Sequence, residues 1–249
     1  SDPFRDGARL QLDEEARAIR RAIERGSARD TLELVPLFAL RTRDLQEALM
    51  RHEPQVVHFA GHGGASGVIY LGDEHGRPRP VGKEALGRLF GALSGSIRAV
   101  VLNGCDTLPT VEVMSQVVDY TIGMNRPITD DSAIVFAEAF YVALAMGKPL
   151  GKSFELAVIQ MELEGNDESA TPVLRVRPGV DAAVPLIAPH ANPANPGAGV
   201  AEAEPVREGA NMENRFQTRR EEEADFGDTG SSRGGATMRN VFGGAQANR

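Results

Sequence analysis

Tryptophan is absent from this chain of 249 residues, cysteine occurs once, and aromatic residues make up only 5%. A single cysteine excludes an intramolecular disulfide, which is typical of a reducing compartment. It also leaves Cys105 as the one candidate thiol nucleophile. No apolar run reaches the roughly 18 residues of a membrane-spanning helix, and the first residues lack the basic and then apolar layout of a signal peptide. We therefore expect a soluble, cytoplasmic protein that is not attached to a membrane.

Leucine and isoleucine are missing from the end of the chain. Neither occurs after Ile187, and the large apolar residues of 189–249 are three valines, three phenylalanines and two methionines. Such a segment cannot bury enough apolar surface to offset the entropy that ordering it would cost. The sequence therefore predicts one domain over 1–188 and a flexible, disordered tail over 189–249.

An excess of basic charge is lacking as well. The net charge of −8 is shared as −6 over 1–188 and −2 over 189–249. Neither part carries the basic excess that is typical of nucleic-acid-binding proteins. We therefore expect no nucleic acid among the partners.

What the chain does contain is an alternation of apolar strands and amphipathic helices. Helices are expected at 13–25, from Thr42, at 83–93, from about 110, at 132–146 with a cap at Asp130 or Asp131, and at 151–163. Strands are expected at 32–35, 56–60, 68–71, 99–102, 120–124 and 173–176. Residues 99–102 are apolar throughout, which is typical of a central strand with both faces covered. The alternation predicts an α/β sandwich with a mostly parallel sheet.

Two of the expected strands lead to reactive side chains. His62 follows the strand at 56–60, and Cys105 follows the strand at 99–102. Functional residues of an open parallel sheet gather beyond the carboxyl ends of its strands, so the imidazole and the thiol face each other if these strands are neighbours. A nearby imidazole can accept the proton of a thiol or, as imidazolium, hold the thiolate. The amides of Gly63 and Cys105 could then bind the oxyanion that develops during attack on a carbonyl.

Structural roles for these residues are open alternatives. A lone cysteine at a strand end is more often a small buried hydrophobic residue, and a histidine beside glycines more often makes a structural hydrogen bond. His58 could join His62 and Cys105 as a zinc ligand, but about 13 Å of strand separate the two histidines. We expect no metal, and a buried, hydrogen-bonded His58. The glycines at 61–64 lead into no phosphate-binding pattern, and no cofactor is expected.

The order of these motifs resembles the CHAT family of caspase-like cysteine peptidases, in the clan of caspases, metacaspases and separases. Residues 58–63 (HFAGHG), 100–105 (VVLNGC) and 120–124 (YTIGM) carry the resemblance, which spans most of 1–188. It implies a caspase-like three-layer sandwich and hydrolysis of peptide bonds in a protein substrate by a dyad of His62 and Cys105. It also implies restraint until a separate sensor or partner protein engages, in a bacterial defence or signalling pathway.

Five residues could, by their position, line the pocket for the residue that precedes the scissile bond. They are Asn103, Asp106, Met124, Asn125 and Asp130. An acidic pocket supplied by Asp106, Asp130 or Asp131 would select arginine or lysine. Asn103 and Met124 would instead suit a neutral or apolar residue, and the preference stays open.

Two other functions are compatible with the sequence. One is a catalytically silent caspase-like interaction module whose tail binds a partner, and the other is a thiol hydrolase of small acyl substrates. A peptidase that prefers basic residues could also process its own tail, in cis or in trans, because the tail contains Arg207, Arg215, Arg219, Arg220, Arg233 and Arg239.

Overall fold

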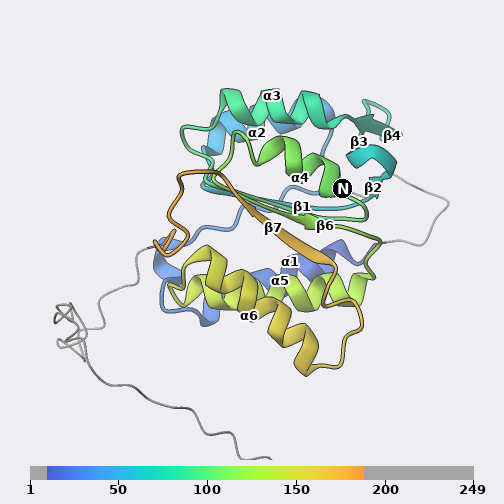
Figure 1. The fold of residues 1–249 in the computed structure, drawn as a ribbon. Helices are drawn as coiled ribbons and strands as arrows, with labels where there is room; N and C mark the ends of the chain where they lie inside the picture. Colours follow the sequence, from blue (N-terminus) through green and yellow to red (C-terminus); the bar gives the residue numbers. More distant parts are fainter. Residues whose placement is uncertain (1–9, 188–249) are drawn as a thin grey trace, which may run out of the picture. The chain divides into compact units, whose positions relative to one another are not determined.

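Three layers make up the part of the chain that the computed structural model describes, residues 10–187. Helices cover both faces of a four-stranded sheet (Figure 1). The expected three-layer α/β sandwich is therefore confirmed. The predicted tail at 189–249, its boundary at residue 188 and its arginines lie outside the described residues.

The sheet is parallel except at one edge, and its strand order is β1-β5-β6-β7. Its strands are β1 (Val56–Ala60), β5 (Ala99–Asn103), β6 (Tyr120–Met124) and β7 (Pro172–Val176). β1, β5 and β6 pair in parallel, and β7 runs antiparallel to β6. All residues of β5 and β6 are buried, as expected for central strands covered on both faces.

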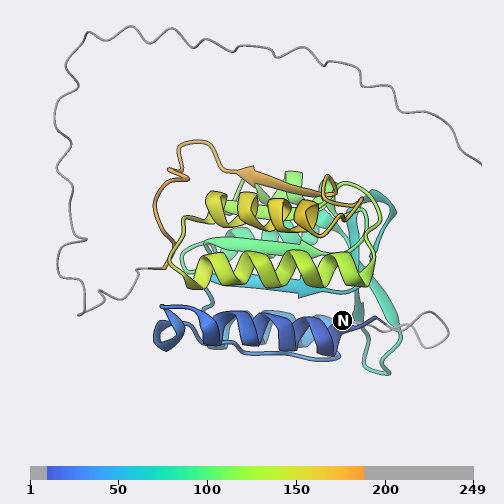
Figure 2. The same ribbon diagram turned by 90° about the horizontal axis from the view of Figure 1, so that it is seen from below.

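Successive side chains of β5 point to opposite faces of the sheet and join two separate hydrophobic cores. Val100 and Leu102 pack in the core that is covered by α2 (Thr42–His52), α3 (Lys83–Ala92) and α4 (Leu108–Met114). Ala99 and Val101 pack in the other core, covered by α1 (Leu12–Arg25), α5 (Asp130–Ala145) and α6 (Leu150–Leu163). Figure 2 shows α1, α5 and α6 lying side by side across this second face.

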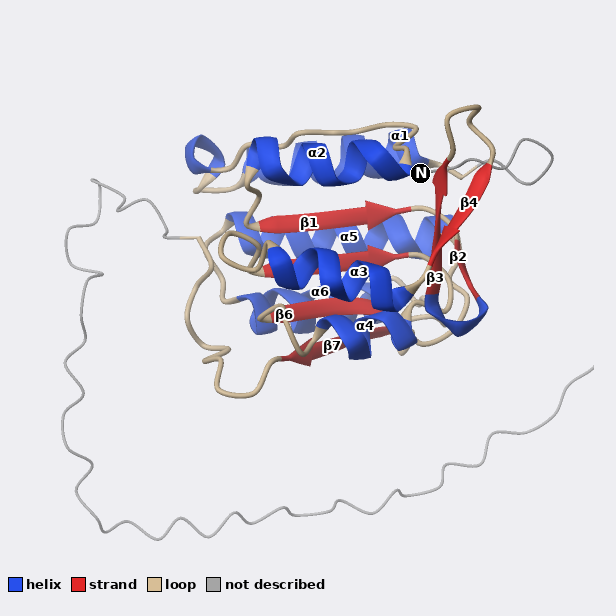
Figure 3. Ribbon diagram, turned by 90° about the horizontal axis from the view of Figure 1, so that it is seen from above, coloured by secondary structure: helices blue, strands red, loops and turns tan. Residues whose placement is uncertain are grey.

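A small antiparallel sheet lies beyond the carboxyl end of β1 (Figure 3). It contains β2 (Gly63–Gly64), β3 (Val68–Gly72) and β4 (Pro78–Val81), and the short helix η2 (Ala65–Gly67) joins its first two strands. A turn joins β3 to β4, and in it the Asp73 carboxylate accepts hydrogen bonds from the backbone amides of His75 and Arg77. The chain enters this sheet directly after His62.

Two local predictions are wrong. Residues 32–35 form no strand, because Leu32 and Leu34 pack on the core while no neighbouring strand offers hydrogen bonds to this segment. Helix α5 is capped by Thr129, whose hydroxyl accepts a hydrogen bond from the Ser132 amide, and not by Asp130 or Asp131. Those two carboxylates instead lie in the first helical turn, where the helix dipole favours negative charge.

No helix between residues 10 and 187 combines the length and the apolar character needed to cross a membrane.

Candidate active site

The ends of β1 and β5 deliver His62 and Cys105 to one cavity. The parallel pairing of the two strands ends with Ala60 opposite Asn103. His62 and Cys105 each follow this last pair by two residues, and both line the same cavity. The neighbouring strands that the expected dyad requires are thus present.

Two glycines let the loops after these strands touch backbone to backbone. A Cβ atom on Gly104 would lie 2.4 Å from the carbonyl oxygen of Gly61. A Cβ atom on Gly63 would lie 1.9 Å from the carbonyl oxygen of Cys105. Both distances are far below van der Waals contact, so only glycine allows the loop of His62 to approach the loop of Cys105 this closely.

Thr107, which sequence reasoning missed, holds the loop of Cys105 through hydrogen bonds of its side chain to the backbone. Its side chain is fully buried, and its hydroxyl lies within hydrogen-bond distance of the carbonyl oxygens of Leu102 and Gly104, at 3.0 and 3.2 Å. The same hydroxyl accepts a hydrogen bond of 2.9 Å from the amide of Met124. Thr107 therefore ties the end of β5 to the end of β6.

The thiol of Cys105 is partly buried. Its Sγ lies 3.8 Å from the carbonyl oxygen of Ile128, on the loop that precedes α5. The next residue, Asp106, has a positive φ of 53°, a left-handed conformation that aspartate tolerates better than most residues. Asp106 therefore turns the chain from Cys105 toward α4.

The cavity beside Cys105 has a volume of about 40 Å³, room for about three water molecules. Besides the two strand ends, its walls come from the start of α1, with Leu10, Gln11 and Glu15, and from the region around the start of α5, with Ile128, Asp130 and Ala133. Four segments that are far apart in the sequence therefore meet at the thiol.

The predicted pocket residues divide into two groups. Asn103 and Asp130 line the cavity, and Asp130 accepts a 2.8 Å hydrogen bond from the amide of Gln11. Asp106, Met124 and Asn125 do not line it. Met124 is fully buried in the core, and the side chain of Asn125 donates to the carbonyl oxygen of Ala170 at 3.3 Å.

Sequence reasoning also missed Glu15, which reaches the cavity from the first turn of α1. Its side chain is buried, and its Oε1 accepts a hydrogen bond of 2.6 Å from the side-chain nitrogen Nδ2 of Asn103. A sequence signal was available, because Glu15 lies four residues before Ile19 and seven before Ala22, on the apolar face of the helix. Burial of a charged side chain on such a face is unfavourable unless a specific partner pairs with it.

His58 is a second hydrogen-bond partner of Glu15, and both of its ring nitrogens form hydrogen bonds. Nε2 lies 2.9 Å from Oε1 of Glu15, and Nδ1 lies 3.2 Å from the hydroxyl of Tyr141. Burial, and then the charge of Glu15, raise the pKa of Tyr141, so its hydroxyl keeps its proton and donates a hydrogen bond to Nδ1 of His58. With Nδ1 accepting from Tyr141, Nε2 of His58 donates to Oε1 of Glu15. The expectation of a hydrogen-bonded His58 is confirmed, and its side chain is partly buried, with 12% exposed.

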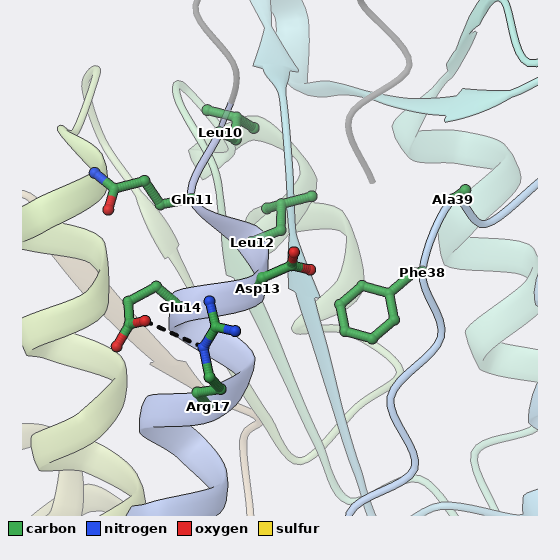
Figure 4. Close-up of a pocket in the computed structure, with 8 residues that line it drawn as sticks. All are labelled: Leu10, Gln11, Leu12, Asp13, Glu14, Arg17, Phe38 and Ala39. Atoms are coloured by element: carbon green, nitrogen blue, oxygen red, sulfur yellow. Dashed lines mark hydrogen bonds and ion pairs between the residues drawn. The ribbon is translucent and has the colours of Figure 1, made fainter.

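No group of three or more histidine, cysteine or carboxylate side chains suited to a metal ion occurs among residues 10–187. A second, larger hollow of about 560 Å³ borders the first turn of α1. Leu10, Gln11 and Leu12 line it together with Phe38 and Ala39, and Figure 4 shows these side chains around it. The segment at 10–12 therefore lines both hollows.

Similarity to known proteins identifies the family of this chain. A curated relative named Roc-COR-CHAT protease, from an unknown prokaryotic organism, is 22% identical to this chain over 128 residues. The matched part makes up 49% of this chain but only 12% of the relative's length. A family model described as the CHAT domain matches residues 8–194, the whole of the described fold. The chain therefore belongs to the CHAT domain family of caspase-like proteases.

Proposed function

We propose that this domain is a cysteine endopeptidase in which Cys105 is the nucleophile and His62 is the general acid and base. The observation that carries the proposal is the parallel pairing of β1 with β5. Because of it, His62 and Cys105 follow their strands at the same edge of the sheet, and both line the same cavity. A thiol beside an imidazole needs no third residue to form a reactive thiolate.

The proposed reaction has two stages. The thiol of Cys105 gives its proton to His62, its sulfur bonds to the carbonyl carbon of the scissile peptide, and the amides of Gly63 and Cys105 donate to the oxyanion. His62 protonates the leaving nitrogen as the carbon–nitrogen bond breaks, which leaves a thioester on Cys105. His62 then takes a proton from water, the water oxygen bonds to the carbonyl carbon, and the carbon–sulfur bond breaks to restore the thiolate.

The comparisons support hydrolysis of peptide bonds over other thiol chemistry. The curated relative is named a protease, and the family match includes both residues of the proposed dyad. A protein substrate is accordingly part of the proposal.

Restraint by a separate sensor or partner protein is also part of the proposal. The cavity beside Cys105 holds only about 40 Å³, whereas binding pockets commonly hold several hundred. A substrate side chain therefore enters only when the lining moves, and binding of a partner is one way to move it.

Chemical labelling combined with cleavage mapping tests the dyad. Wild type, Cys105→Ala, His62→Ala and, as a matched control, His75→Ala would each be incubated with a denatured proteome, and new chain ends mapped by mass spectrometry. His75 is exposed in the turn between β3 and β4. We expect cleavage by wild type and His75→Ala and none by Cys105→Ala. The cleavage rate of His62→Ala should be lower than that of wild type by about 10²-fold or more.

Alkylation by iodoacetamide provides a readout that a restrained enzyme still gives. Cys105 should react faster than glutathione at pH 7 in wild type and more slowly in His62→Ala. Equal chain ends for wild type and Cys105→Ala, together with an ordinary alkylation rate, would instead indicate the catalytically silent interaction module.

A further inference from the structure

The cavity beside Cys105 has a polar floor made by two buried side chains. Asn103 ends β5 two residues before Cys105, and Glu15 lies in the first turn of α1. Each is only 4% exposed, and each lines the cavity. The floor is therefore continuous with the proposed site of bond cleavage.

The side-chain oxygen of Asn103 is a hydrogen-bond acceptor that has no donor among the described residues. Nδ2 of Asn103 donates to Oε1 of Glu15 at 2.6 Å and to the carbonyl oxygen of Ala133 at 3.1 Å. Both partners are acceptors, so the amide group cannot be reversed. Its Oδ1 is buried and has no hydrogen-bond partner among the described residues. An unpaired buried carbonyl oxygen is unfavourable and indicates that a donor from outside the fold belongs there.

Glu15, in the same floor, has a second carboxylate oxygen that can accept a hydrogen bond. Within residues 10–187, both of its side-chain hydrogen bonds fall on Oε1, one from Asn103 and one from His58. No arginine or lysine of this part of the chain forms an ion pair with it. The carboxylate therefore keeps Oε2 for another donor, and a buried carboxylate favours a cationic one.

We propose that Glu15 and Asn103 bind the side chain that precedes the scissile bond and select lysine or arginine there. The inference rests on the proposed peptidase function. The ammonium or guanidinium group donates to Oε2 of Glu15 and Oδ1 of Asn103, and the apolar side chains of Ala133 and Ile134 line the way for the aliphatic stem. An apolar side chain would leave both acceptors unpaired, and an acidic one would be repelled.

The start of α1 is the part of the lining that can move to admit such a side chain. Gln11 is held across the cavity by hydrogen bonds from its amide to Asp130 and from its side chain to Asp131, at 2.8 and 3.3 Å, and both are exposed to solvent. The segment at 10–12 also lines the larger hollow in Figure 4. A displacement of Leu10 and Gln11 would join the two hollows and lengthen the pocket while leaving Glu15 in the helix.

The test compares peptides that differ only at the residue before the scissile bond. Arginine, lysine, glutamine, methionine and glutamate versions would be offered to the full chain, as hydrolysable substrates and as peptidyl ketones that alkylate Cys105. We expect wild type to prefer arginine or lysine over methionine by about 10²-fold in kcat/KM. Glu15→Gln should lower that preference at least tenfold.

Matched controls separate the floor of the pocket from its rim. Asp130→Asn and Asp131→Asn remove the carboxylates at the rim, and both should keep the basic preference. Glu15→Gln keeps an oxygen to accept from Asn103 and His58, and an unchanged melting temperature would show that the variant is folded. Persistence of the basic preference in folded Glu15→Gln, or a wild-type preference for methionine, would overturn the proposal.

Failure of the underlying function has a different signature. Wild type would then cleave none of the peptides and react with none of the ketones, and iodoacetamide would label Cys105 no faster than it labels glutathione. That result removes the peptidase and the pocket together, whereas altered preference with intact reactivity bears on the pocket alone.

Discussion

At the scale of single residues, the contact between the loops of His62 and Cys105 depends on two glycines, which have no side chain. Gly63 and Gly104 place the two loops in backbone contact. Any β-carbon there forces the loops apart, and the imidazole and thiol would separate with them. The site is thus sensitive to substitutions that add no charge and remove no hydrogen bond.

Gly104→Ala tests this sensitivity. We expect the free energy of unfolding to fall by about 2 kcal/mol or more, because overpacking of this kind costs about 1–3 kcal/mol. The alkylation rate of Cys105 should fall as well. Urea unfolding and iodoacetamide labelling measure the two effects.

Gly95→Ala is the matched control for that change. A β-carbon at Gly95 has no atom within 4 Å, so its effect on unfolding should stay within about 0.5 kcal/mol. Similar losses in the two variants would show that the contact between the loops is not the cause.

Residues of the site differ in how far the sequence could reveal them. His62 and Cys105 could be predicted because each directly follows an apolar run, which reports where its strand ends. Glu15 lies 88 residues from Asn103 in sequence, so only the packing of α1 brings the two together. Unlike Glu15, which lies on an apolar helix face, Thr107 has no sequence signal, since a threonine after a strand is compatible with many local roles.

At the scale of secondary-structure elements, the start of α5 forms one wall of the cavity. Ile128 and Asp130 line it, and Thr129 between them caps the helix. The hydroxyl of Thr129 also donates to Glu168 at 2.7 Å. Burial tends to raise the pKa of Glu168, but hydrogen bonds from Ser132 and Thr129 outweigh it and lower the pKa.

Thr129→Ala should lower the free energy of unfolding by about 1 kcal/mol, the usual effect of losing an N-cap. The serine variant keeps the hydroxyl and should retain most of the stability. Thermal or urea unfolding distinguishes the two, and an equal loss in both variants would contradict a role for the hydroxyl.

Element boundaries show where local pattern stops being sufficient. The helices at 13–25 and 151–163 were predictable because their apolar residues recur at helical spacing. The alternation at 32–35 is equally regular, yet a strand also needs a partner, and no local pattern reports whether one is there. The same limit applies to β7, whose antiparallel direction depends on how the chain returns to the sheet.

At the scale of the whole molecule, one ionic cluster joins three strands at the edge opposite the site. Asp119, which precedes β6, is bonded to Arg98 before β5 and to Arg177 after β7. Burial tends to raise the pKa of Asp119, but the hydrogen bonds and charges of the two arginines outweigh it and lower the pKa. The pairing therefore stabilises the folded state only while the carboxylate is ionised.

The sign of this effect predicts an acid-sensitive stability. Unfolding restores a pKa of about 3.9 to Asp119, so its contribution is present above that pH and is lost as the pH falls through the lower, folded value. Asp119→Asn should lower the free energy of unfolding by about 2 kcal/mol at pH 7, and less below pH 4. Urea titrations from pH 7 to pH 3 measure the difference, and parallel curves for the two proteins would refute the assignment.

The burial of Glu15 in the cavity wall makes substrate choice depend on the rotational phase of α1. Each residue advances an α-helix by about 100°, and Ala18 and Ala22 fix the rotation of α1 through their packing in the core. One residue inserted between Glu15 and Ala18 would leave a helix of similar composition, but it would swing the carboxylate a quarter-turn or more away from Asn103. Insertion of an alanine would preserve the helical propensity and the net charge of α1, but the discrimination between substrates would be lost.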